Sequence, residues 1–122
     1  MSRVIHFEMP ADDPERVIQF YEKTFGWRFD KWDGPIEYWL ISTGSEDHPG
    51  IDGGLARRTD PAVGIENTID VKNLEISLIA VETNGGEIIR PKMAVPGVGW
   101  MVYIKDTEGN IFGLMEEDPE AA

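Results

Sequence analysis

The sequence contains no cysteine among its 122 residues. This absence excludes a disulfide framework, a thiolate zinc site and a cysteine nucleophile. It also fits a reducing compartment, and we expect a cytoplasmic protein because residues 1–3 run directly into a strand-like stretch that contains His6 and Glu8, instead of a secretory signal. A chain of this length is expected to form a single domain, 1–122, with its own hydrophobic core.

Basic residues are scarce, with 11 Lys and Arg against 23 Asp and Glu, and the formal net charge is −12. Such a surface repels phosphate backbones and anionic lipids, so we predict no nucleic-acid partner and no membrane partner. No apolar run approaches the roughly 20 residues that a membrane-spanning helix needs. A nucleophilic triad, a phosphate-binding loop and a dinucleotide fingerprint are also lacking. The acidic tail, 116–122, is interpreted as a solvated end.

The first half of the chain shows a strand, a helix and three further strands. Asp13 can cap a helix whose first position, Pro14, suits that place, and Gly26 stands where a left-handed helix end is expected. Alternation and β-branched or aromatic residues predict the strands. They are expected at 4–9, near 27–29, at 37–42 and at 51–56.

The second half repeats this order. Asn73 can cap a helix with Leu74, Leu78 and Val81 on one face, closed by the glycines at 85 and 86. Strands are predicted at 65–71, 87–90, 99–105 and 110–116, and residues 91–97 are interpreted as a loop.

The two halves keep a constant spacing. Asn73 follows Asp13 by 60 positions, Gly86 follows Gly26 by 60, and Glu66 follows His6 by 60. Near the module ends, Gly113-Leu114 follows Gly54-Leu55 by 59. The sequence therefore predicts an α+β fold made of two βαβββ modules, about 1–60 and 61–118, that form a curved mixed sheet around a cleft.

Four stretches are similar in order and motif to the vicinal oxygen chelate superfamily, which includes glyoxalase I, bleomycin-resistance proteins and extradiol dioxygenases. They are HFEMPADDPERVIQFYEKTFGW, GIDGGL, ETNGGEIIRPKMAVPGVGW and KDTEGNIFGLMEED. The resemblance covers essentially the whole chain and implies a small-molecule ligand in the cleft and a homodimer.

The resemblance also implies where a metal ion would be held in the metal-using branches. The first-strand positions are His6 and Glu66, which are suitable ligands, and the last-strand positions are Gly54 and Gly113, which have no side chain to donate. Two protein ligands predict weak binding of a divalent ion. We therefore expect no cofactor and no metal; if a metal binds, its ligands are His6 and Glu66. Glu116 lies three residues from Gly113 and so points to the opposite face.

Other residues are candidates for binding a ligand. Glu66 and Thr68 share the polar face of their strand, and Glu8 shares a face with His6. Glycine within a strand marks either the close approach of a ligand or a bulge, and both readings stay open for Gly54 and Gly113. The aromatic candidates for a cleft wall are Trp39 and Trp100, although large aromatic residues also build cores.

Three hypotheses of function remain. The first is a metal-independent protein that binds a small aromatic or amphipathic molecule. The second is a metal-dependent or acid–base lyase or isomerase of the glyoxalase type, with His6 and Glu66 as catalytic residues. The third is an interaction module.

Overall fold

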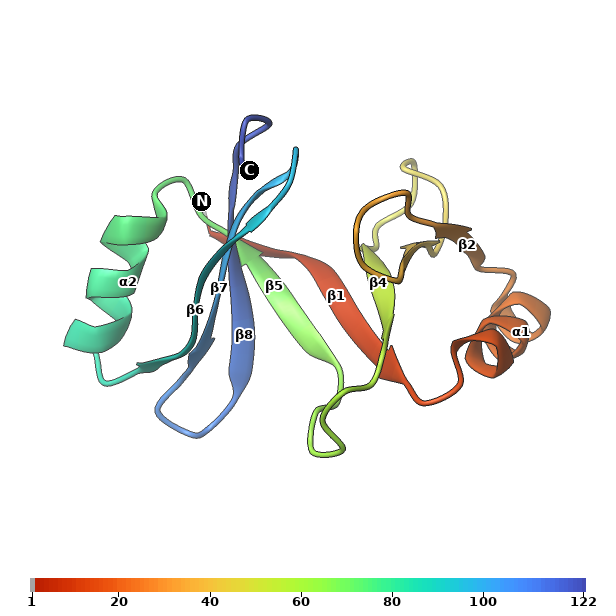
Figure 1. Cartoon of the computed structure of the whole chain (residues 1–122), viewed down its shortest axis with the longest axis horizontal. Helices are drawn as coiled ribbons and strands as arrows, with labels where there is room; N and C mark the ends of the chain where they lie inside the picture. Colours follow the sequence, from red (N-terminus) through yellow and green to blue (C-terminus); the bar gives the residue numbers. More distant parts are fainter. Residues whose placement is uncertain (1) are drawn as a thin grey trace. The chain divides into compact units, whose positions relative to one another are not determined.

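A computed structural model describes residues 2–122 as two helices and eight strands (Figure 1). The first five elements are β1 (Arg3–Ala11), α1 (Pro14–Phe25), β2 (Arg28–Lys31), β3 (Tyr38–Ser42) and β4 (Asp52–Arg57). The last five are β5 (Glu66–Asp70), α2 (Leu74–Thr83), β6 (Glu87–Val95), β7 (Gly99–Lys105) and β8 (Ile111–Glu117). The predicted order of strand, helix and three strands, used twice, is confirmed.

The chain divides into two compact units, and each is a small mixed sheet with one helix. The first unit comprises residues 6–65, with strands in the order β2-β3-β4-β1. The second comprises residues 66–122 together with those before His6, and its strands follow the order β5-β8-β7-β6. In both units the first and last strands of a module pair in parallel, while the hairpin strands pair antiparallel. The predicted α+β class is confirmed.

Both helices begin and end as their sequences indicate. The Asp13 carboxylate accepts a hydrogen bond from the backbone N–H of Arg16, and the Asn73 side chain accepts one from Ile76 in the same way. Each cap satisfies one of the amides that the first helical turn leaves free. Gly26 closes α1 with φ of 73°, a left-handed conformation that glycine adopts without steric cost.

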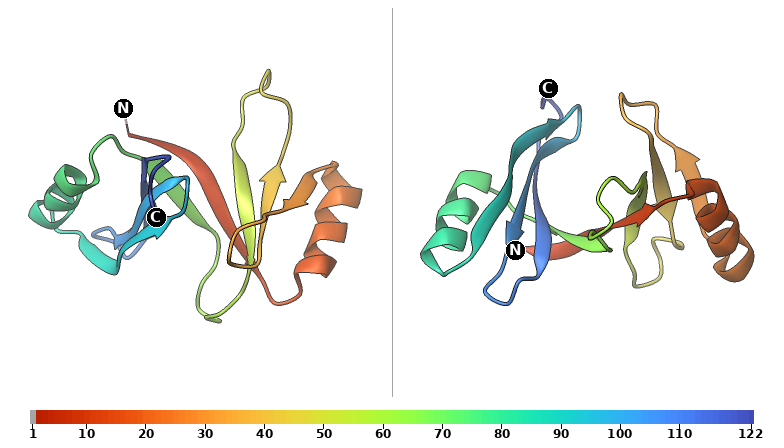
Figure 2. Two further views of the ribbon diagram at one scale, coloured as in Figure 1. Left: turned by 45° about the horizontal axis from the view of Figure 1, so that its top comes forward. Right: turned by 60° about the horizontal axis from the view of Figure 1, so that its bottom comes forward.

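Each helix packs on one face of the sheet of its own unit, as Figure 2 shows from two sides. Under α1 the buried core centres on Leu55, which is fully buried, and under α2 it centres on Val102, also fully buried. The predicted helix face Leu74, Leu78 and Val81 packs on this second core. The opposite face of each sheet is therefore the one that can carry polar functional side chains.

Strand β6 is longer than the sequence predicts, since it continues to Val95 through the segment interpreted as a loop. The strand can include Pro91 because β6 lies at the edge of its sheet, where a missing N–H costs little. Its register with β7 also shifts twice, between Ile88 and Arg90 and between Arg90 and Met93. These irregularities change which side chains face the helix.

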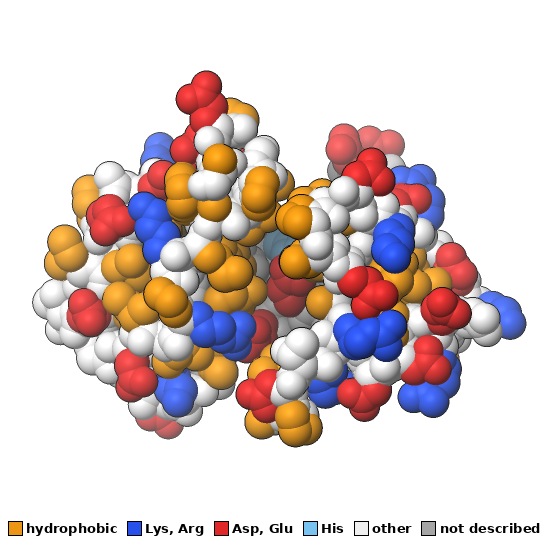
Figure 3. All heavy atoms as spheres, in the orientation of Figure 1, with side chains coloured by type: hydrophobic (Ala, Val, Ile, Leu, Met, Phe, Trp, Pro, Cys, Tyr) orange, Lys and Arg blue, Asp and Glu red, His pale blue; other side chains and the backbone are white. Residues whose placement is uncertain are grey.

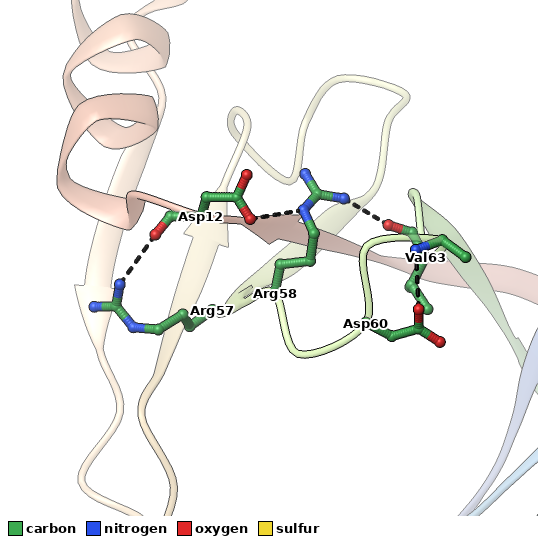
Figure 4. Close-up of polar contacts among 6 residues, drawn as sticks. Asp12, Arg57, Arg58, Asp60 and Val63 are labelled. Atoms are coloured by element: carbon green, nitrogen blue, oxygen red, sulfur yellow. Dashed lines mark hydrogen bonds and ion pairs between the residues drawn. The ribbon is translucent and has the colours of Figure 1, made fainter.

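Arg57 and Arg58, at the end of β4, form hydrogen bonds with the residue that follows β1 and with the loop before β5 (Figure 4). The Arg58 guanidinium donates to the Asp12 carboxylate at 3.1 Å and to the Val63 carbonyl at 2.6 Å, and Arg57 donates to the Asp12 carbonyl. Arg57 also pairs with Glu37 and holds the pKa of that carboxyl below its usual range. The parallel pairing of β1 with β4 thus ends in a defined polar cluster.

Within residues 2–122 no helix has the length and apolar character needed to cross a membrane. The face in Figure 3 carries acidic and basic side chains spread among apolar ones, and the apolar side chains gather over the sheet of the second unit.

Candidate functional site

The polar face of the first unit brings together three side chains from two strands. His6 and Glu8 stand two residues apart on β1 and therefore point to one face, opposite the core residues Phe7 and Met9. Tyr38, at the start of β3, reaches the same face. The site therefore holds an imidazole, a carboxylate and a phenol within contact of one another.

The Tyr38 hydroxyl is the centre of this cluster. It donates to the Glu8 carboxylate at 3.1 and 3.2 Å, and it lies 3.1 Å from Nε2 of His6. Nε2 is also 3.3 Å from a Glu8 oxygen. Because the phenol has one proton and the carboxylate only accepts, this arrangement requires the hydrogen of His6 on Nε2. The side chains of His6 and Glu8 stay 30% and 26% exposed, so a ligand can reach them.

Gly54 makes room for the phenol. It pairs with Glu8 across β1 and β4, and a Cβ added at this position would overlap the hydroxyl oxygen and ring of Tyr38. The geometry gives a third reading of this glycine, close approach by a tyrosine of the same unit, and the register of β4 with β1 and β3 is continuous there. The last-strand position of the metal-using pattern is thus occupied by a phenol oxygen that belongs to β3.

A surface hollow of about 570 Å³ opens beside His6. Its wall combines polar groups with the side chain of Leu40, which is 48% exposed. Asp52 also lines it, but its carboxylate accepts hydrogen bonds from the backbone N–H and the hydroxyl of Thr43. Asp52 therefore organises the turn after β3.

The second unit presents a related polar face with different contents. Glu66 and Thr68 lie on β5, are 7% and 2% exposed, and share one face as the alternation predicts. Thr68 pairs with Gly113 on β8, and a Cβ added at Gly113 would overlap the terminal methyl of Met101. In both modules, therefore, a side chain from the neighbouring strand fills the space beside the glycine.

Arg90 is the partner of Glu66. Its guanidinium donates to the Glu66 carboxylate at 2.9 Å and lies 4.0 Å from the centre of the Tyr103 ring. Because Glu66 is almost fully buried, the positive charge beside it offsets the cost of burying the carboxylate. Glu66 is thus already paired within its own unit.

Neither tryptophan predicted to line the ligand site joins these faces. Trp39 packs against the core under α1, and Trp100 packs against the core under α2. The neighbours that do point to the polar faces are Tyr38 and, on β7, Tyr103. Strand alternation carries this signal, because Trp39 shares a face with the buried Ile41.

Glu116 lies on the face that strand alternation predicts. Glu116 points to the helix side of the second sheet, where its carboxylate accepts the backbone N–H of Leu74 at 2.8 Å. It therefore caps α2 and takes no part in the polar face.

A divalent cation does not fit the donors that these faces offer. On the polar face of the first unit His6 and Glu8 could supply metal-ligating atoms, and both form hydrogen bonds with Tyr38. In the second unit Glu66 is paired with Arg90. The spaces at Gly54 and Gly113 are filled by the Tyr38 phenol and the Met101 methyl. Across residues 2–122 no group of three or more His, Cys, Asp or Glu side chains is arranged to hold a metal ion.

Comparison with known sequences gives two matches. Residues 3–44 match the family model described as bleomycin resistance protein-like, N-terminal. A glyoxylase-like domain-containing protein of Didymella fabae is 34% identical over 120 residues, which are 93% of this chain and 92% of that protein.

Solved structures show the same fold. A methylmalonyl-CoA epimerase from Mycobacterium tuberculosis superposes with a TM-score of 0.72 at 15% identity, covering 95% of this chain and 88% of that one. A glyoxalase/bleomycin resistance protein/dioxygenase superfamily member from Vibrio splendidus 12B01 gives a TM-score of 0.68 at 15% identity, covering 96% and 100%.

Replacing Gly54 tests the packing of Tyr38. The change Gly54→Ala is expected to push the phenol out of its place and lower the free energy of unfolding by about 1–3 kcal/mol, because the added methyl overfills the site. The matched control is Gly44→Ala, where an added Cβ meets no atom within 4 Å. Chemical denaturation measures both, and equal stability of the two variants would contradict the placement of Tyr38.

The contact between Trp100 and Asp118 predicts a pH dependence. The backbone N–H of Glu120 and the indole N–H of Trp100 donate to the Asp118 carboxylate and hold its pKa below the ordinary value of 3.8. A lowered folded-state pKa stabilises the fold at pH values above the unfolded pKa, and this stabilisation is lost as the pH falls through the folded value. The indole N–H resonance of Trp100 should report a midpoint below 3.8. Asp118→Ala should abolish this transition, whereas a midpoint at or above the ordinary value would refute the assignment.

Proposed function

This chain belongs to the vicinal oxygen chelate superfamily of glyoxalase- and bleomycin-resistance-like proteins, and on that premise we propose that it binds a small aromatic or amphipathic molecule without a metal ion. The observation that carries the proposal is the Tyr38 hydroxyl, which lies between His6 and Glu8 in the space left by Gly54. A fixed set of hydrogen-bonding groups takes the position of a metal ligand.

The surroundings of this cluster suit a small organic ligand. The hollow beside His6 combines the exposed apolar side chain of Leu40 with a few polar groups, and sites for small molecules have this mixed character. The phenol and imidazole can exchange hydrogen bonds with a carbonyl, hydroxyl or amide of the ligand. Apolar contact supplies affinity, and the three polar groups set the orientation.

An acid–base enzyme is the alternative reading of the same cluster. Proton abstraction next to a carbonyl needs a positioned base and a donor for the developing oxyanion. The hydrogen-bond arrangement uses Nε2 of His6 as a donor and Glu8 as the acceptor of the phenol proton. Both groups are thus hydrogen-bonded to Tyr38, and either would have to leave this contact before it could act as a base, which favours binding over turnover.

Titration with 1-naphthamide, a neutral aromatic amide, tests the proposal. We expect saturable binding by calorimetry that is unchanged when EDTA is added, and a roughly fivefold weaker affinity for Tyr38→Phe, the loss of about 1 kcal/mol for one hydrogen bond. The control is Tyr21→Phe, because the ring of Tyr21 stacks on Trp27 in the core of the same unit.

Three outcomes would overturn the proposal. They are the absence of binding, its loss in EDTA, or equal affinities for the two phenylalanine variants. Turnover of the methylglyoxal–glutathione hemithioacetal by the EDTA-treated protein, lost in His6→Gln, would instead establish the enzyme.

A further inference from the structure

A basic side chain of the second unit lies where the sequence alone would not place it. Arg90 stands opposite Tyr103 in the β6–β7 ladder, with a register shift on each side of it. Such irregularities re-aim a side chain and commonly occur beside functional sites. Lys92, two residues later, contacts Glu75 of α2 and the ring of Trp100, so it lies on the helix side. The shift between Arg90 and Met93 thus places the arginine and the lysine on opposite faces.

Arg90 ends a row of four residues that crosses the whole sheet. The pairings run from Thr68 on β5 to Gly113 on β8, then to Tyr103 on β7 and Arg90 on β6. Glu66 lies two residues before Thr68 on the same face, and the Arg90 guanidinium reaches back to it. One face of one unit therefore presents a guanidinium, a phenol and a hydroxyl in register.

The Arg90 guanidinium is held in place by two side chains of its own unit. The Glu66 carboxylate fixes one of its nitrogens at 2.9 Å, and the Tyr103 ring supports its plane at 4.0 Å. The Arg90 side chain is still 39% exposed, and Glu66 is the acceptor that it contacts within residues 2–122. Because a guanidinium carries five N–H donors in a rigid fork, the remaining donors can meet a planar anion without loss of side-chain freedom.

Thr68 provides a second polar group at the same face. Its hydroxyl is buried and has no hydrogen-bond partner among the described residues. An unsatisfied buried hydroxyl costs about 1–3 kcal/mol, so its presence calls for a partner. The hydroxyl lies beside Gly113, whose open side is filled by the flexible end of Met101. Methionine is unbranched and flexible, so this end of the side chain can rearrange more readily than a branched residue.

From these contacts we propose that Arg90, with Thr68, binds the carboxylate group of a small organic anion at the polar face of the second unit. This inference goes beyond the proposed function, since it assigns a second binding face that lies within the second unit alone. A guanidinium supported by a buried carboxylate retains its hydrogen-bond fork, and charge-assisted bonds to a carboxylate are among the strongest in proteins. The net charge of −12 on the whole chain opposes the binding of an anion, so the attraction must come from the local Arg90 guanidinium.

The test compares 1-naphthoate with its neutral isostere 1-naphthamide on the full chain. Calorimetry should show naphthoate binding at least about tenfold more tightly than naphthamide, as expected for hydrogen bonds to a charged group. Arg90→Gln should remove this preference and leave naphthamide affinity unchanged. The Arg90 Nε–H resonance should shift on addition of naphthoate, and that shift reports the contact itself.

Lys92→Gln is the matched control, because Lys92 is on the same strand and also has one carboxylate and one aromatic partner. It should keep the full preference for naphthoate. Equal binding of naphthoate and naphthamide to the wild-type protein, or an equal loss in both glutamine variants, overturns the carboxylate site and leaves the proposed function standing. Failure of both compounds to bind overturns both proposals.

The variant Arg90→Lys keeps the positive charge and the partner of Glu66. If this variant loses the preference for naphthoate while its melting temperature is unchanged, the preference depends on the planar guanidinium group.

Discussion

The polar face of the first unit depends on one packing contact between β3 and β4, in which the Tyr38 side chain fills the space beside Gly54. The phenol can lie between His6 and Glu8 because no Cβ stands at position 54. The tyrosine satisfies the imidazole and the carboxylate together, and so fixes their orientation without an ion. Glycine within a strand costs stability, and here that cost is offset by a complete hydrogen-bonded cluster.

The second unit solves the same geometric problem with different chemistry. Gly113 leaves a space as Gly54 does, but a methionine methyl fills it, and the charge on the face comes from the Arg90–Glu66 pair. Duplication thus explains why the glycines correspond, while the residues around them have diverged. One unit offers neutral and acidic hydrogen-bonding groups, and the other offers a supported guanidinium. The two faces therefore differ in the chemistry that each can offer to a bound molecule.

The fold followed from the sequence because caps and periodicity are local signals. Asp13, Gly26 and Asn73 mark the helix ends by chemistry that needs no tertiary contact. The polar faces were predicted only in part. The resemblance points to His6 and Glu66, and alternation along single strands adds Glu8 and Thr68. Trp39 lies on the helix side of its sheet with the buried Ile41, whereas its neighbour Tyr38 reaches the polar face. Arg90 could not be found by alternation at all, since the register shifts on both sides of it exist only once β6 pairs with β7.

We propose that side chains of the chain itself occupy the places where the resemblance to metal-using relatives would put an ion. Calorimetric titration of the chelator-treated protein with Zn²⁺, Ni²⁺ and Mn²⁺ is the test. We expect no stoichiometric binding tighter than micromolar for any of the three ions, because His6, Glu8 and Glu66 are already paired and both glycine spaces are filled. One-to-one binding tighter than micromolar that is lost in His6→Gln would contradict it.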